Sequence, residues 1–451
     1  MKTPIADFVK SYGQSGTARF HMPGHKGKSL LGFEESDITE IAGADALYEA
    51  SGIIAESEAN AAALFGSRAT FFSTEGSSLC IRAMVHMAVR RFKEKNGRSV
   101  RPTVVAARNA HKAFLYAAAA LDCDVYWLKG KDTDFTLCRF VLDENELKTA
   151  LFDKNLPIAA VYITTPDYLG GMLDIEKIAE ISHQSDIPLL VDQAHGAYLR
   201  FLKPSLHALD FGADLCCDSA HKTLPSLTGA AYLHVGKNAV SAFENEAKEA
   251  MAFYGSSSPS YLTLASLDET NKVLAENYCE ALAQTVKRID ALKESIRKQG
   301  FFVCEGDPLK ITVEASKSGY CGKELASILR QNKIEVEYAD PDFAVLMATP
   351  SNTEQDFEKA EAAFSSIQAK APLVSEKPKM KRMQVALSAR EAMLAPRETV
   401  RTEASLGRIL ATPCVACPPA VPIAVCGEII DQSAIDAFLY YGIDEIAVIK
   451  E

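Results

Sequence analysis

Short apolar runs alternate with helix-length segments between about residues 60 and 240. Each run is apolar at successive positions, as expected of a strand that is buried on both faces of a sheet. The runs lie at residues 103–107, 125–128, 158–164, 188–192, 214–217 and 231–235. With the intervening helical segments, they predict parallel strands of a doubly wound α/β sheet.

The rest of the chain predicts further parts. A helical stretch with a polar face at 266–299 precedes a second α/β alternation at 301–347, which predicts a smaller domain. Residues 370–382 are rich in Lys and Pro and predict a linker, after which 384–451 can form a compact unit. We therefore expect an N-terminal segment, a large domain, a small α/β domain and a C-terminal α+β domain at 1–60, 61–275, 276–370 and 371–451.

Composition excludes several classes of protein and partner. The 451 residues are 48% hydrophobic and 24% charged, which is ordinary for a globular chain and excludes a collagenous or disordered one. Lys and Arg number 48 against 59 Asp and Glu, so the net charge of −11 gives no attraction to nucleic acid or to an anionic membrane. No apolar stretch approaches the roughly 18 residues of a spanning helix, and residues 1–10 lack a signal-peptide pattern. We expect a cytoplasmic protein with neither partner.

The cysteines predict reduced thiols. The chain has 11 Cys, an odd number, and two of them are the adjacent Cys216 and Cys217. The single CxxC pair, Cys414 and Cys417, has no second pair to complete a zinc site. We therefore expect neither a disulfide framework nor a metal site.

Ligands of doubly wound sheets bind at the carboxyl ends of the strands, and Lys222 lies in a loop at such an end. Partial burial between apolar strands lowers the pKa of a lysine and favours the neutral amine, which can form a Schiff base with an aldehyde. The alternative is an ordinary loop lysine in a surface salt bridge.

Asp192 directly follows another apolar run. A carboxylate there could hold the protonated nitrogen of a pyridine ring, which then acts as an electron sink. Ala194 is small enough to admit a flat ring, and His195 could face the ring or a substrate. The alternative is an Asp that caps a helix, beside a structural His.

Two further elements precede these on the chain. Gly76, Ser77 and Ser78 begin a predicted helix, where backbone N–H groups and the helix dipole favour a phosphate, although an ordinary capping loop has the same pattern. His111 follows the run at 103–107 and could stack on a planar cofactor, although a lone His is more often structural. The joint occurrence of all four elements favours the functional interpretation.

These residues resemble the fold-type-I enzymes that use pyridoxal 5′-phosphate. Residues 19–27, Arg-Phe-His-Met-Pro-Gly-His-Lys-Gly, are similar to the N-terminal signature of the Orn/Lys/Arg decarboxylase class-I family. Further matches lie at 39–47, 256–261, 307–310, 319–320, 386–392 and 407–409. The resemblance implies a large domain with a mostly parallel seven-stranded sheet, in a short form that lacks the extra N-terminal domain of larger members.

The resemblance also implies roles for individual residues. Lys222 would hold the cofactor covalently, Asp192 would pair with the pyridine nitrogen, and His111 would stack on the ring. The phosphate would lie near Gly76, Ser77, Ser78, Ser219 and His221. Ser257 or its neighbours would reach the cofactor of a partner subunit, because the resemblance implies a homodimer to which residues 1–60 contribute. Lys222 or a neighbouring His, such as His195 or His221, would return a proton to the substrate.

The implied reaction is decarboxylation of a basic amino acid, with arginine favoured over lysine or ornithine. An acidic pocket should bind the cationic side chain, with Glu335 and Glu337 among the candidates. The alternatives are transamination or elimination on the same cofactor, marked by an arginine such as Arg390 or Arg397 holding the α-carboxylate, and a non-catalytic protein that kept the fold. Two departures from the family weaken any inference about the substrate: Gln193 replaces a Glu, and residues 416–422 replace a Tyr-Pro-Pro-Gly-Ile-Pro segment.

Overall fold

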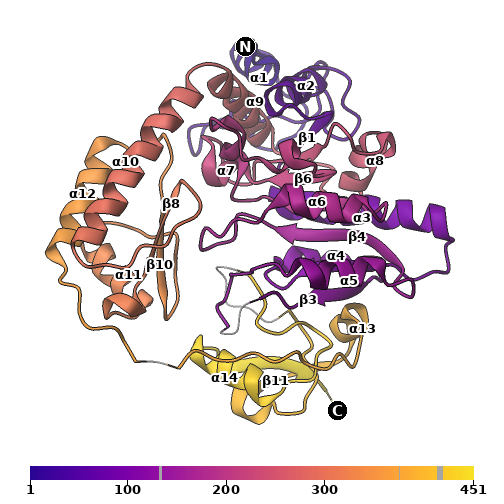
Figure 1. Cartoon of the computed structure of the whole chain (residues 1–451). Coiled ribbons are helices and arrows are strands. Elements are labelled where there is room, and N and C mark those ends of the chain that lie inside the picture. The colour runs from indigo at the N-terminus through magenta and orange to yellow at the C-terminus, as the bar shows by residue number, and fades with distance from the viewer. Residues whose placement is uncertain (132–134, 375, 414–419, 451) are drawn as a thin grey trace. The chain divides into compact units, whose positions relative to one another are not determined.

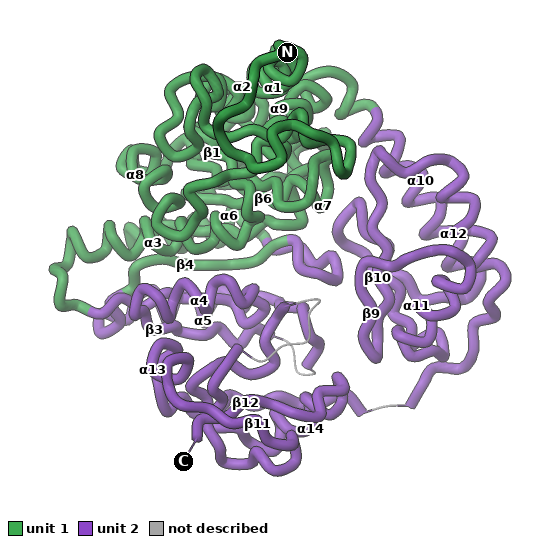
Figure 2. Tube along the Cα trace, turned by 180° about the vertical axis from the view of Figure 1, so that it is seen from behind, with its two compact units in different colours: residues 1–100, 158–165, 174–280 green, residues 101–157, 166–173, 281–451 purple. Residues whose placement is uncertain are grey.

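A computed structural model describes residues 1–131, 135–374, 376–413 and 420–450. The chain divides into two compact units, coloured separately in Figure 2. The first unit comprises residues 1–100, 158–165 and 174–280, and the second comprises 101–157, 166–173 and 281–451. The predicted CxxC pair, Cys414 and Cys417, lies outside the described residues.

A seven-stranded sheet has the order β1-β7-β6-β5-β4-β2-β3 (Figure 1). The strands are β1 (Ala69–Ser73), β2 (Thr103–Ala107), β3 (Asp124–Leu128), β4 (Ile158–Thr164), β5 (Leu189–Asp192), β6 (Leu215–Asp218) and β7 (Ala231–Val235). Strands β2, β5, β6 and β7 are buried at every position, which is why they appear in the sequence as uninterrupted apolar runs. The α/β class and the mostly parallel sheet are thus as predicted.

One strand direction was predicted wrongly. β7 runs antiparallel to both β6 and β1. The connection from β6 to β7 contains only the four-residue helix α7 (Ala220–Thr223) and turns, and so lacks the longer helix that usually joins parallel strands. The apolar runs also omit β1, because Thr70 and Ser73 interrupt its apolar pattern.

The helices of the first unit pack on this sheet and at its end. They are α1 (Pro4–Gln14), α2 (Ile53–Phe65), α3 (Gly76–Asn96), α6 (Ile175–His183), α7, α8 (Ser241–Ala252) and α9 (Tyr261–Ala275), with short 3-10 helices η1 (Ala197–Phe201) and η2 (Ala208–Phe211). Helix α3 packs along β1 and β4 to β7. It begins three residues after β1, which runs in the same direction as β5 and β6, so its N-terminus lies at the carboxyl ends of these strands.

The predicted helical stretch at 266–299 is two helices, α9 and α10 (Tyr278–Lys298), separated near Glu276. Tyr278 accounts for the break, because its ring is buried against Phe201 at 5.5 Å and its hydroxyl donates to the Thr223 carbonyl at 3.2 Å. These contacts fix the chain at that point and redirect it.

The second unit contains two smaller sheets and most of α10. Its further elements are α4 (Lys112–Leu121), α5 (Glu144–Phe152), β8 (Lys310–Glu314), η3 (Ser316–Ser318), α11 (Gly322–Gln331), β9 (Tyr338–Ala339), β10 (Phe343–Met347), α12 (Glu354–Ser366), α13 (Ala389–Leu394), β11 (Arg397–Arg401), η4 (Thr402–Ala404), α14 (Gln432–Tyr440) and β12 (Glu445–Ile449). Strands β8, β10 and β9 form an antiparallel sheet, and β11 pairs with β12. One apolar core contains Phe343 and Val345 of β10 together with Ile446 and Val448 of β12. The two small sheets therefore share a core.

Two predictions from composition can be compared with the described residues. In that part of the chain, no helix has the length and apolar character needed to cross a membrane. Nine cysteines there are free thiols, and six of them are buried, including Cys216 and Cys217. These thiols agree with the prediction of reduced cysteines.

Candidate active site

Asp192 ends β5 as a buried carboxylate with a fixed orientation. Its Oδ2 accepts a hydrogen bond from the Tyr162 hydroxyl at 2.9 Å, and its Oδ1 accepts one from the Ala194 N–H at 3.2 Å. The Cys217 thiol lies 3.7 Å from Oδ1. Burial and the charge of Asp192 raise the pKa of Tyr162 well above its ordinary value, so the phenol keeps its proton and donates it.

Lys222 and His195 meet at the ends of β5 and β6. The Lys222 Nζ is 3.1 Å from the His195 Nε2, and His195 is 4% exposed. His195 belongs to the turn that follows Asp192, and Lys222 belongs to α7, which follows β6. The two strands are parallel neighbours, so the predicted amine, imidazole and carboxylate lie at the carboxyl ends of adjacent strands.

Ser219 connects the lysine turn to the start of α3. Its hydroxyl donates to the Ser77 hydroxyl at 2.8 Å. Gly76 has φ of +70°, and apart from its chain neighbours and its own helix backbone nothing lies within 4 Å of the position that a Cβ would take there. Glu75, at the N-cap of this 21-residue helix, makes no side-chain capping bond. The Gly76 N–H itself donates to the Gly229 carbonyl at 2.7 Å. The first turn of α3 therefore offers an anion the space at Gly76 and the N–H groups that follow it.

The other predicted residues of the first unit have separate contacts. His221 Nδ1 lies 2.9 Å from the Ala230 carbonyl oxygen, and Ser78 is half-buried in the first turn of α3. Ser257 is exposed, and the N–H of its neighbour Ser256 donates to Glu75 at 2.6 Å. The segment predicted to serve a partner subunit thus starts beside the N-terminus of α3.

Several residues named in the sequence analysis belong to the second unit. His111 is the N-cap of α4 and accepts the Ala113 N–H at Nδ1 at 3.1 Å. The Arg390 guanidinium donates to the Ala119 and Ala120 carbonyls near the C-terminus of α4, both at 3.2 Å. In this structure it therefore binds a helix end. Glu335 is exposed and pairs with Arg330 at 2.7 Å, Glu337 is partly exposed, and Arg397 is exposed on β11.

The residues of the first unit fit pyridoxal 5′-phosphate. The cofactor carries an aldehyde, a basic ring nitrogen and a phosphate, which require an amine, a carboxylate and an anion site. Lys222, the buried Asp192 and the uncapped start of α3 provide these groups. Ala194 is buried beside Asp192 and leaves the strand end without a bulky side chain.

Sequence reasoning missed Tyr162, which orients Asp192. It lies inside the apolar stretch of β4, where a tyrosine is indistinguishable from an ordinary core residue. The link between Ser77 and Ser219 was also missed, although both residues were assigned to phosphate binding, because residues distant in sequence give no signal of mutual contact.

Comparisons with known proteins show what this chain is similar to. The family model "Orn/Lys/Arg decarboxylase, major domain" matches residues 3–311. The chain is 28% identical to an arginine decarboxylase of Halalkalibacterium halodurans over 464 residues, which covers 96% of this chain and 92% of the relative. It is 27% identical to an arginine decarboxylase of Bacillus subtilis, with coverage of 98% and 94%.

Solved structures extend the comparison to the fold. The E. coli constitutive lysine decarboxylase matches with a TM-score of 0.77 at 16% identity, over 100% of this chain and 82% of that chain. Lysine decarboxylase A of Pseudomonas aeruginosa matches with a TM-score of 0.79 at 17% identity, over 97% and 75%. These likenesses confirm the predicted fold class.

Proposed function

Because the chain belongs to the Orn/Lys/Arg decarboxylase family, we propose that it decarboxylates a basic amino acid, arginine in preference to lysine or ornithine. The geometry of Lys222, His195 and Asp192 at adjacent strand ends is the observation that carries the proposal. The preference for arginine rests on relatives named arginine decarboxylase that align over nearly the whole chain.

The proposed cofactor is pyridoxal 5′-phosphate. When bound, its protonated ring accepts the electron pair that is released as carbon dioxide leaves the substrate Cα. Lys222 would hold the cofactor through its aldehyde carbon, and the negative charge of Asp192 would keep a proton on the ring nitrogen. Tyr162 holds the carboxylate of Asp192 in one orientation through its 2.9 Å hydrogen bond.

Anion binding is assigned to the start of α3. Gly76, Ser77, Ser78 and Ser219 would bind the phosphate, together with His221, which lies on the same turn as Lys222. The hydroxyl pair of Ser77 and Ser219 supports this assignment, because it brings the start of α3 and the lysine turn within one hydrogen bond. His111 stacks on the ring in this proposal, as the resemblance implies.

Proton transfer is assigned to Lys222 and His195. Their nitrogens are 3.1 Å apart, so a proton on one can pass to the other without movement of the backbone. After carbon dioxide has left, the ammonium form of Lys222 would donate a proton to the substrate Cα and become the neutral amine. A protonated His195 would then return a proton to Nζ and be reprotonated from water. The product is the corresponding amine.

A homodimer in the cytoplasm is the proposed state of the protein. Residues 20–33 support the dimer, since they expose several large apolar side chains that a second copy could cover: Phe20, Met22, Leu30, Leu31 and Phe33. Ser257 of each subunit then faces the cofactor of the other. The proposed domain boundaries remain 60/61, 275/276 and 370/371.

The test incubates the purified, cofactor-loaded protein separately with arginine, lysine and ornithine. We expect carbon dioxide and the matching amine in equal amounts, fastest from arginine, and no turnover from Lys222→Ala. Sedimentation of the same sample should give twice the chain mass. Absence of carbon dioxide with all three substrates would reject the proposed reaction, and keto-acid formation would indicate transamination instead.

A further inference from the structure

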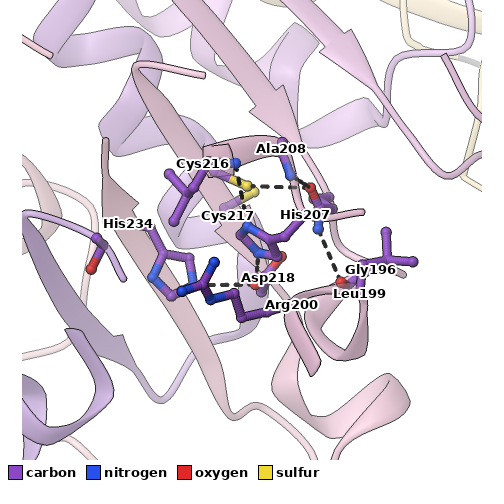
Figure 3. Close-up of polar contacts among 12 residues, drawn as sticks. Gly196, Leu199, Arg200, His207, Ala208, Cys216, Cys217, Asp218 and His234 are labelled. Carbon is purple, nitrogen blue, oxygen red and sulfur yellow. Dashed lines mark hydrogen bonds and ion pairs between the residues drawn. The ribbon is translucent and has the colours of Figure 1, made fainter. Parts of the chain in front are cut away.

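One loop contacts both turns that carry the proposed catalytic residues. Residues 205–208, here called the clamp loop, are the last part of the connection from η1 to η2 together with the first residue of η2, Ala208. His207 binds Asp218, which precedes the lysine turn, and the next residue, Ala208, binds Gln193, which follows Asp192. Figure 3 shows His207, Ala208 and Asp218 close together.

The contact with the lysine turn is a buried hydrogen bond between His207 and Asp218. The His207 Nε2 and the His234 Nε2 lie 2.9 and 3.1 Å from the same oxygen of Asp218, and all three side chains are fully buried. The other carboxylate oxygen has no hydrogen-bond partner among the described residues. Burial alone would raise the pKa of Asp218, but His207 and His234 lower it, so the carboxylate is charged and depends on these donors.

The contact with the Asp192 turn runs through an amide. The Gln193 Oε1 accepts the Ala208 N–H at 2.9 Å, and its Nε2 donates to the Gly196 carbonyl at 2.9 Å. An ionised glutamate, the family residue at this position, has no proton to give to Gly196. The replacement of Glu by Gln therefore adds a bond to Gly196, so that the side chain that accepts from the clamp loop is also tied to the turn that carries His195.

The clamp loop is itself fixed at its other end. The Ser205 hydroxyl and the Arg200 guanidinium both bind Asp210, at 2.5 Å each, and the Leu206 N–H donates to the Leu199 carbonyl at 3.1 Å. A loop held in this way can transmit position from one turn to the other, because neither of its contacts lies on a freely moving segment.

His207, Cys216 and Asp218 lie close enough to hold a metal ion. One oxygen of Asp218, the His207 Nε2 and the Cys216 thiol are already used in hydrogen bonds, however, since His207 donates to Asp218 and the thiol points to Gln193 at 3.8 Å. Burial also raises the pKa of Cys216 well above its ordinary value, which opposes the thiolate that a metal needs. The hydrogen bonds favour a positioning role over a metal site.

We propose that the clamp loop sets the distance between the two catalytic turns, with His207 and Gln193 as positioning residues for Lys222 and His195. The proposal rests on the proposed function, because it assigns the turns their catalytic role. Two links from adjacent residues of one loop fix the spacing of Asp192 and Lys222 more firmly than either link alone.

The test is a double-mutant cycle with His207→Leu and Gln193→Leu, read out in two ways. In the cofactor-loaded protein, each substitution should lower kcat about tenfold or more with little change in KM. Each should also displace the pH midpoint of the visible absorbance by at least about 0.5 pH unit, because the Lys222 nitrogen shifts relative to Asp192. His207→Gln keeps a donor toward Asp218 and should restore most of both properties.

Stability measurements on the cofactor-free protein complete the cycle. The losses of unfolding free energy from His207→Leu and Gln193→Leu should be less than additive, because the second substitution acts on a clamp loop that the first has already detached from one turn. His183→Leu is the matched control: it breaks a 2.8 Å His–Asp pair of the same unit, and it should add to either loss without moving the absorbance midpoint. Additive losses together with unchanged midpoints would overturn the clamp. A wild-type protein that takes up no cofactor would instead reject the proposed function, while the stability cycle would still judge the clamp.

Discussion

Asp192 and Asp218 end neighbouring strands as buried carboxylates, but their hydrogen-bond partners differ and indicate different roles. Asp192 is held by a neutral phenol, a backbone N–H and a thiol, so its charge is left for a cation that binds from outside the chain. Asp218 shares one oxygen between two imidazoles of its own chain. Both residues occupy equivalent positions at the end of an apolar run in the sequence, and only their contacts in the structure distinguish their roles.

Asp192→Asn tests the role of the ring-pairing carboxylate. The amide keeps the size of the side chain but removes the charge that stabilises a protonated ring nitrogen. We expect kcat to fall by a factor of about 100 or more, or about 3 kcal/mol in the barrier. Steady-state kinetics check this, with circular dichroism as a control for folding. A variant with normal kcat would show that another group holds the ring.

Ala420 stands where the family's C-terminal segment has a glycine, and its φ is +57°. An L-residue is strained in this left-handed region, whereas glycine is not. Ala420→Gly should therefore stabilise the protein by roughly 1 kcal/mol in spite of the greater flexibility of the unfolded chain. Urea unfolding measures the effect, and a loss of stability would show that the methyl group packs favourably enough to offset the strain.

At the scale of elements, apolar runs predicted six strands to within one residue at each end, because burial on both faces leaves a simple pattern. The reversed direction of β7 and the break before α10 were not predictable in the same way. Both depend on what happens between elements: a short connection in one case and the anchoring of Tyr278 in the other. The sequence revealed the site residues that lie at strand ends. It did not reveal Tyr162 and His207, because their roles depend on partners distant in sequence.

Helix α1 offers a prediction at this scale. Its N-cap residue, Thr3, makes no side-chain cap, and Asp268 of α9 instead accepts the N–H groups of Ile5 and Ala6 at 2.8 and 3.0 Å. Asp268→Ala removes this cap and leaves the Ser57 hydroxyl without its acceptor, so we expect a loss of about 2–3 kcal/mol. Thermal unfolding and faster proteolysis within residues 1–14 check it. Asp7→Ala, on the same helix, serves as a control without a capping role.

At the scale of the whole molecule, the stability of the chain should depend on a carboxyl buried in the second unit. Burial raises the pKa of Asp340 from 3.8 to about 6, although bonds from the Phe343 N–H and the Tyr338 hydroxyl oppose the rise. The unfolded chain loses this proton near pH 4, whereas the folded chain keeps it until about pH 6. The contribution of Asp340 to the unfolding free energy is therefore fully present below about pH 4 and is lost as the pH rises through about 6.

Asp340→Asn isolates that dependence. The amide oxygen can still accept the backbone N–H groups, but it does not titrate. The unfolding free energy of the wild type, relative to the variant, should fall between about pH 4 and 7 by on the order of 2 kcal/mol. Denaturant unfolding at several pH values gives the comparison. A constant difference across this range would mean that the carboxyl ionises normally in the folded protein.

The whole account depends on a covalent bond between Lys222 and the proposed cofactor, and one measurement tests that bond directly. The protein is supplied with pyridoxal 5′-phosphate, reduced with borohydride to make any linkage permanent, and digested for peptide mass mapping. The account predicts one modified peptide, which contains Lys222. Modification of a different lysine, or of none, would contradict it.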